Sequence, residues 1–169
     1  MATPTFAHLP AAKQERILEA ARTEFSRYSL AEAQVARIIK DAQISRGAFY
    51  KYFTDLKDAY HTVFQAAMTT VHAPIKHAIT SPSELAQFVT AILASPYAAF
   101  LRLYFTVNEG VINAHPALTN LAPVEWAATV LAHETVRAVL VTPANQQDLL
   151  HRYATAINHL KEDHHVSRT

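Results

Sequence analysis

Four side chains that can donate hydrogen bonds to phosphates and base edges fall within seven residues: Arg46, Tyr50, Lys51 and Tyr52. Guanidinium and ammonium groups bind phosphates and guanine edges, and hydroxyl groups bind phosphates. Phe49 and Phe53 are four residues apart and would share the inward face of a helix. The spacing predicts a short helix from Arg46 to about Phe53, with Ala48 beside the polar groups on its outer face.

Two elements must position this helix. The stretch from Val35 to Ala42 carries apolar residues at helical spacing, and Gln43 to Ser45 then interrupt the pattern. Ser45 is well placed to cap the next helix, and Gly47 would let the backbone approach a duplex closely. Two short helices separated by three residues are the layout of a helix-turn-helix, which presents its second helix to the major groove.

The aromatic residues of the predicted helix allow a second interpretation, in which all four fill the core of a small helical bundle. We expect Phe49 and Phe53 to be buried. Tyr50 and Tyr52 are harder to bury because each hydroxyl would need a partner. For Tyr50 and Tyr52 we therefore favour the interpretation in which they face outward and contact DNA.

The charge distribution agrees with a polyanion as the partner. Residues 1–53 hold 8 Lys and Arg against 5 Asp and Glu, whereas residues 54–169 hold 7 against 9. Phosphate contacts need cations gathered in one part of the chain, and the first third provides them.

The rest of the chain predicts further helices and no sheet. With only 2 glycines and few alternating windows, long helices are favoured over strands. Ser81 and Glu84 predict a capping box, Thr54 an N-cap, and Pro74 the end or a kink of a helix. The expected helices are 10–28, 55–79, one that starts at Pro82, 97–109, 123–141 and one from Thr142-Pro143 to about 163; a Pro- and Asn-rich loop spans 114–122.

The stretch from Val35 to Phe53, followed by Leu56-Lys57-Asp58, resembles the DNA-binding region of the TetR family of bacterial regulators. The resemblance covers roughly residues 10–60 and is most specific in Ser-Arg-Gly, Tyr-x-Tyr-Phe and the downstream lysine. It differs where the family usually has a turn glycine, here Gln43, and a β-branched hydroxyl residue, here Ala33-Gln34. The usual glycine suggests that this turn position has a positive φ. A non-glycine residue such as Gln43 is then expected to be strained there.

This resemblance implies an all-α homodimer, with a helix-turn-helix domain at 1–53 and a helical regulatory and dimerisation domain at 54–169. It implies a transcriptional regulator, usually a repressor, that binds a palindromic DNA operator and releases it when a small molecule binds. The last two long helices would form most of the dimer interface. The expected DNA contacts are Gln34, Ser45, Arg46, Gly47, Ala48, Tyr50, Lys51, Tyr52 and Lys57.

The best candidates for a ligand pocket mix aromatic surface with a few polar groups, as small-molecule sites do. Taken one at a time, such residues more often fill a core, and Arg102 can equally be a surface cation. The candidates are Tyr97, Phe100, Arg102, Tyr104, Asn108 and Trp126.

Other function classes receive less support. Nine of ten histidines lie beyond residue 53 and raise the idea of a metal sensor, but their spacing does not match ligand pairs on one helix. A constitutive DNA-binding dimer without a ligand is a further alternative. We find no motif of an enzyme and expect no cofactor. The absence of cysteine, of a signal peptide and of a long apolar run predicts a soluble, cytoplasmic protein without a membrane segment.

Overall fold

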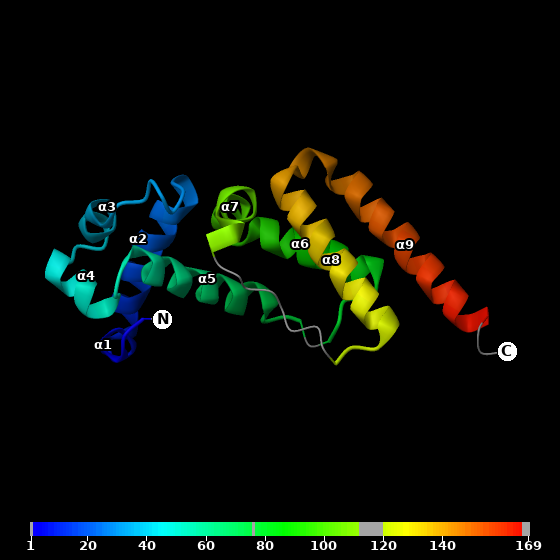
Figure 1. Ribbon diagram of the computed structural model, residues 1–169, viewed down its shortest axis with the longest axis horizontal. Coiled ribbons are helices and arrows are strands. Elements are labelled where there is room, and N and C mark those ends of the chain that lie inside the picture. The colour runs from blue at the N-terminus through cyan, green and yellow to red at the C-terminus, as the bar shows by residue number, and fades with distance from the viewer. Residues whose placement is uncertain (1, 76, 112–119, 167–169) are drawn as a thin grey trace. The chain divides into compact units, whose positions relative to one another are not determined.

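A computed structural model describes residues 2–75, 77–111 and 120–166, and the regular elements of these residues are all helices (Figure 1). The predicted all-α fold is therefore confirmed. No single helix in this part of the chain is long and apolar enough to cross a membrane. The bent pair formed by Pro82–Ala94 and Ala98–Asn108 meets the length and composition criteria when its two helices are taken together.

The helices form two compact units. Unit 1 comprises Met1–Val71 and Ala99–Asn113, and unit 2 comprises His72–Ala98 and Ala114–Thr169. A segment from the second half of the chain thus packs with the N-terminal helices. The functional boundary expected between residues 53 and 54 is a different division and stays a prediction.

Unit 1 begins with four helices that surround one core: α1 (Pro4–Ala7), α2 (Ala11–Arg27), α3 (Val35–Asp41) and α4 (Arg46–Tyr52). The helix-turn-helix prediction placed α3 and α4 within one residue of these bounds. The side chains at the centre are fully buried, as their helical spacing predicted: Ile17, Ala21, Phe25, Ile38, Phe49 and Phe53. The short α1 was not predicted, because four residues are too few to show a periodic pattern.

The rest of unit 1 adds α5 (Leu56–His72) and a composite helix. The composite helix begins as α7 (Ala98–Leu103), continues as the π-helix η1 (Tyr104–Asn108) and ends as the 3-10 helix η2 (Glu109–Val111), where a single helix was expected. Aromatic rings join these elements. The ring of Tyr60 on α5 lies 4.9 Å from that of Phe25 and 5.1 Å from that of Phe100, centroid to centroid.

The predicted N-cap is wrong for α5, and for α6 the predicted N-cap residue Ser81 is confirmed but its side-chain cap bond is absent. Asp55, and not Thr54, caps α5, because its Oδ1 accepts a hydrogen bond from the Asp58 amide at 2.7 Å. Ser81 makes no cap bond to α6 (Pro82–Ala94), because its hydroxyl is paired with the Ser83 hydroxyl at 2.7 Å. Both helices nevertheless begin within two residues of the predicted starts, since Pro82 and the acidic first turn suit a helix N-terminus.

Unit 2 contains α6, α8 (Pro123–Val141), the 3-10 turn η3 (Pro143–Asn145) and α9 (Gln146–Val166). Helices α8 and α9 are joined by η3 and lie side by side as an antiparallel pair (Figure 1). The predicted bounds of α8 are confirmed. The predicted loop at 114–122 lies largely outside the described residues, which resume at 120.

The turn between α3 and α4 contains a residue in the left-handed region. Gln43 has a φ of 52°, and no other non-glycine residue in the described chain has a positive φ. The strain that the sequence predicted at this position is therefore present. The left-handed conformation costs about 1–2 kcal/mol for a residue with a Cβ atom.

Replacing Gln43 with glycine should stabilise the protein, because glycine adopts this conformation without the steric cost. Part of the gain is offset by the larger entropy of a glycine in the unfolded chain, so we expect about 0.5–1 kcal/mol. The measurement is the free energy of unfolding in urea. Gln43→Ala is the control, because alanine keeps the Cβ atom. An equal gain from both substitutions would show that the φ angle is not the cause.

Candidate nucleic-acid interface

The orientation of α4 follows from its cap and its buried face. The Ser45 hydroxyl accepts a hydrogen bond from the Ala48 amide at 3.1 Å, which confirms the predicted N-cap. Phe49 is fully buried and its ring lies 5.2 Å from that of Phe53. Because the Ser45 cap and the buried Phe49 fix the orientation of α4, the opposite side of the helix faces solvent.

Most of the predicted DNA-contacting residues lie on this solvent side. Tyr50 is 46% exposed, and the Arg46 guanidinium lies 5.8 Å from the centroid of its ring. Lys51 is exposed, Ala48 is half-buried, and the space around Gly47 is open. Gly47 therefore leaves room for a close approach to its backbone, although nothing in the protein itself requires a glycine there.

The prediction that Tyr52 faces outward is wrong. Tyr52 is 6% exposed and packs beneath α1, with its ring 6.1 Å from that of Phe6. The Lys13 ammonium lies 5.8 Å from the centroid of the same ring. Tyr52 therefore belongs to the support of α4 and not to its outer face.

Thr3, directly before helix α1, also provides hydrogen-bond donors for the last carbonyl groups of α4. The Thr3 amide donates to the Tyr52 carbonyl at 2.9 Å, and the Thr3 hydroxyl donates to the Lys51 carbonyl at 2.7 Å. The last carbonyls of a helix lack partners within it, so these bonds stabilise its C-terminus. Sequence reasoning missed this contact, although Thr3-Pro4 is a helix-start signal of the kind used elsewhere in the chain.

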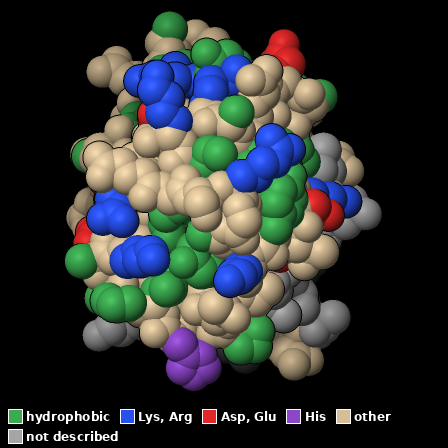
Figure 2. Space-filling view, turned by 90° about the vertical axis from the view of Figure 1, so that its left-hand side faces the viewer, with side chains coloured by type: hydrophobic (Ala, Val, Ile, Leu, Met, Phe, Trp, Pro, Cys, Tyr) green, Lys and Arg blue, Asp and Glu red, His purple; other side chains and the backbone are tan. Residues whose placement is uncertain are grey.

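The flanking candidates Gln34 and Lys57 are both exposed. Gln34 is the N-cap residue of α3, and Lys57 lies in the first turn of α5. Figure 2 shows the side of the molecule that carries α3 and α4. Lys and Arg side chains surround apolar and uncharged polar surface there, and few acidic side chains are visible. Such a surface suits a polyanionic partner.

A buried carboxylate holds α3 in place. Glu24 on α2 is 5% exposed and accepts hydrogen bonds from the Gln34 amide at 2.7 Å and from Arg37 at 2.6–2.9 Å. These bonds to Glu24 raise the pKa of Arg37 above its ordinary value. The central carbon of the Arg37 guanidinium also lies 3.9 Å from the centroid of the Tyr28 ring. At the other end of α3, Arg16 donates to the Ala42 carbonyl at 3.0 Å.

The six predicted ligand residues are divided between the two units. Phe100, Tyr104 and Asn108 are buried in unit 1, where Arg102 is exposed. In unit 2, Tyr97 is half-buried and Trp126 is 50% exposed.

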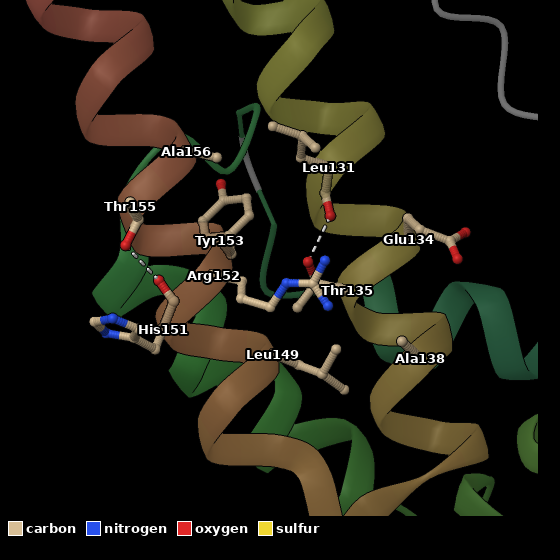
Figure 3. A pocket seen from close by; sticks show the side chains of 10 residues that line it. All are labelled: Leu131, Glu134, Thr135, Ala138, Leu149, His151, Arg152, Tyr153, Thr155 and Ala156. Carbon is tan, nitrogen blue, oxygen red and sulfur yellow. Dashed lines mark hydrogen bonds between the residues drawn. The ribbon is translucent and has the colours of Figure 1, made fainter.

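Two clefts lie within unit 2, and none of these six residues lines them. One, of about 610 Å³, lies between α8 and α9. Figure 3 shows Arg152 reaching across it from α9 towards α8. The other, of about 370 Å³, lies against α6. It is lined by Pro74, Ile75, His77, Ile79, Glu84, Gln87, Phe88 and Ala91.

Within the described ranges, no three His, Asp or Glu side chains are placed to hold one metal ion.

Comparison with known proteins agrees with the arrangement of unit 1. Residues 17–58 match the family model described as bacterial regulatory proteins, tetR family. The fold is similar to the crystal structure of a TetR family transcriptional regulator from Chloroflexus aurantiacus J-10-FL, with a TM-score of 0.57 and 20% identity. The match covers 96% of this chain and 98% of that one. No curated protein matches the chain.

Removing the charge of Glu24 should loosen α3. Glu24→Gln keeps the size of the side chain but loses the charge-assisted bonds to Arg37, so we expect the melting temperature to fall by about 5 °C. Glu19→Gln is the matched control on α2, because Glu19 is 67% exposed and lies 3.8 Å from Arg22. The control should change the melting temperature little. Equal melting temperatures for both variants would contradict the role of Glu24.

Proposed function

This chain belongs to the TetR family of bacterial regulatory proteins and is a DNA-binding transcription regulator, and from that premise we propose a homodimeric repressor that a small molecule releases from a palindromic operator. Residues 1–53 form the proposed DNA-binding domain, and residues 54–169 the regulatory and dimerisation domain. The observation that carries the proposal is the solvent-facing side of α4, with Arg46, Tyr50 and Lys51 held outward by the burial of Phe49.

The proposed contacts divide into two kinds. Arg46 and Lys51 carry charges that can reach base edges or phosphates, and Tyr50 offers a hydroxyl for a phosphate. Lys57, Gln34 and the N-terminal amides beside Ser45 and Gly47 would fix the register on the backbone. A helix N-terminus favours such phosphates because its amides and its dipole point towards them.

A dimer is part of the proposal because seven residues of α4 can read only a few base pairs. Two copies read two half-sites about one helical turn apart, which gives a site long enough to be specific. Support for the interface comes from exposed apolar side chains on α8, where Trp126 is 50% and Val130 39% exposed. The two lie four residues apart and share one face of the helix.

The cleft against α6 is the proposed ligand site. Its volume of about 370 Å³ falls within the range of small-molecule pockets, and Ile75, Ile79 and Phe88 give it apolar walls. Glu84 and Gln87 supply polar groups that could orient a ligand. A constitutive dimer without a ligand is the competing function, and the second experiment below separates the two.

The DNA contacts can be tested by truncating side chains on the outer face of α4. Tyr50→Ala and Lys51→Ala should each weaken binding to genomic fragments selected with the wild-type protein, by about tenfold. The measurement is fluorescence anisotropy over a range of salt concentrations. Lys51→Ala should also lower the salt dependence by about one counterion if Lys51 contacts a phosphate.

The control for these variants is Arg27→Ala, because Arg27 is an exposed cation at the end of α2, away from α4 in the sequence. Its affinity should stay close to that of the wild type. Unchanged binding by both α4 variants would remove α4 from the interface.

Filling the cleft tests the ligand. A compound that binds only the folded protein raises its melting temperature, so a metabolite screen should yield ligands that also release DNA. Ala91→Trp places a large ring in the cleft and should abolish that shift while DNA binding persists. Thr90→Trp is the control, because Thr90 is exposed on α6 but does not line the cleft. A ligand response that survives Ala91→Trp would place the site elsewhere, and a screen without any ligand would favour the constitutive dimer.

A further inference from the structure

A polar junction inside unit 1 connects the π-helix to the loop that precedes α3. Asn108, the last residue of η1, is 2% exposed, and its Oδ1 accepts a hydrogen bond from the Leu30 amide at 3.2 Å. The bond joins residues 78 positions apart in the sequence. Leu30 belongs to the segment between α2 and α3, so this bond ties the entry of α3 to the composite helix.

The junction leaves two buried groups without well-formed hydrogen bonds. Neither Asn108 Nδ2 nor the Tyr60 hydroxyl makes a hydrogen bond of good geometry, and Tyr60 is fully buried. Burial raises the pKa of Tyr60, and the Asn108 side chain, as a weak hydrogen-bond partner of the hydroxyl, acts in the opposite direction. A buried polar group without a well-formed hydrogen bond destabilises the folded state, so a specific role of Asn108 would explain why it is kept there.

The orientation of the Asn108 amide is set by Leu30. An amide N–H can only donate, so Asn108 must direct its oxygen, and not its nitrogen, at Leu30. The nitrogen then remains beside Tyr60 without a well-formed bond. A leucine at position 108 would fill similar volume without unpaired groups, and it would lose only the bond to Leu30.

The segment held by Asn108 leads directly into the proposed DNA interface. Gln34 occupies the N-cap position of α3, and its amide donates to the Glu24 carboxylate at 2.7 Å. Helix α3 then packs on α4. Two polar ties therefore act on the entry of α3, one from α2 and one from η1, and the second comes from beyond the first 53 residues.

We propose that Asn108 is a positioning residue of the DNA interface, which holds the loop before α3 through the Leu30 amide. The inference rests on the proposed DNA-binding function, but the tether itself can be detected without DNA. Tyr60 is the neighbour of the tether and takes no part in holding the loop. Asn108 therefore acts on DNA binding through α3 and does not touch DNA.

The experiment measures amide hydrogen exchange at Leu30 and affinity for the selected operator in the full-length protein. Asn108→Ala should accelerate exchange at Leu30 and weaken operator binding about 3- to 10-fold, the ratio expected for one hydrogen bond. Asn108→Asp keeps an oxygen for Leu30 and offers another to the Tyr60 hydroxyl. It should retain both the protection and the affinity.

Two further variants separate positioning from packing. Tyr60→Phe removes only an unpaired hydroxyl, so the melting temperature should stay the same or rise and the affinity should not change. Thr106→Ala is the matched control on η1, because Thr106 is exposed and its hydroxyl bonds to the Arg102 carbonyl of its own helix. If the alanine variant does not fold, Asn108→Leu replaces it, since leucine is close to asparagine in shape.

Several results would overturn the proposal. Leu30 exchange unchanged by Asn108→Ala would show that no tether exists, and faster exchange with unchanged affinity would show that the tether does not position the interface. A loss of affinity in Asn108→Ala that Asn108→Leu does not share would assign the effect to core packing, because leucine refills the volume without supplying an oxygen for Leu30. Unfolding of both apolar variants while Asn108→Asp folds would make the residue a structural requirement only. A wild type that selects no DNA would instead contradict the proposed function, with the exchange result still decisive for the tether.

Discussion

The burial of Phe49 is the constraint on which the outer face of α4 depends. A helix of seven residues has little stability of its own, because nucleation fixes several residues for each hydrogen bond gained. The fully buried ring of Phe49 and its contact with Phe53 provide the tertiary packing that such a helix needs. With Phe49 inward, helical geometry directs Arg46, Tyr50 and Lys51 away from the core. The polar face is thus a consequence of the apolar one.

Packing alone leaves the ends of short helices with unpaired backbone groups, and polar contacts from neighbouring elements satisfy them. Ser45 closes the start of α4 and Thr3 closes its end. The ends of helix α3 are also paired with side chains of α2. The Gln34 amide at its start donates to Glu24, and Arg16 donates to the Ala42 carbonyl at its end. Each of these side chains replaces the bonds that a longer helix would make internally. Ser45 belongs to the turn of the helix-turn-helix, whereas Thr3, Glu24 and Arg16 lie outside the motif, so the ends of its helices are completed in part by residues beyond it.

The parts of the fold that sequence predicted well are those set by local chemistry. Ser45, Pro82 and Pro123 mark helix starts because caps and a fixed φ act within a few residues, and the strain at Gln43 was visible as the absence of a turn glycine. Tyr52 was misplaced because its burial depends on Phe6 of α1, and a helix of 4 residues is too short to predict from periodicity. Asn108 was predicted as a ligand contact, whereas the structure places its oxygen on Leu30. Such long-range contacts leave no periodic signal in one sequence.

The buried polar groups of unit 1 differ in how fully they are paired, and that difference separates their roles. The Glu24 carboxylate accepts several hydrogen bonds and faces a cation, so its burial is compensated and it can serve as a fixed anchor. Asn108 and Tyr60 are compensated only in part. The bond from the Leu30 amide to Asn108 is neutral and 3.2 Å long, whereas the bond from the Gln34 amide to the Glu24 carboxylate is charge-assisted and 2.7 Å long, so the first is the weaker of the two. The entry of α3 is thus held by a firm tie from α2 and a weaker one from η1, and the weaker tie is the one that a change outside the helix-turn-helix can release.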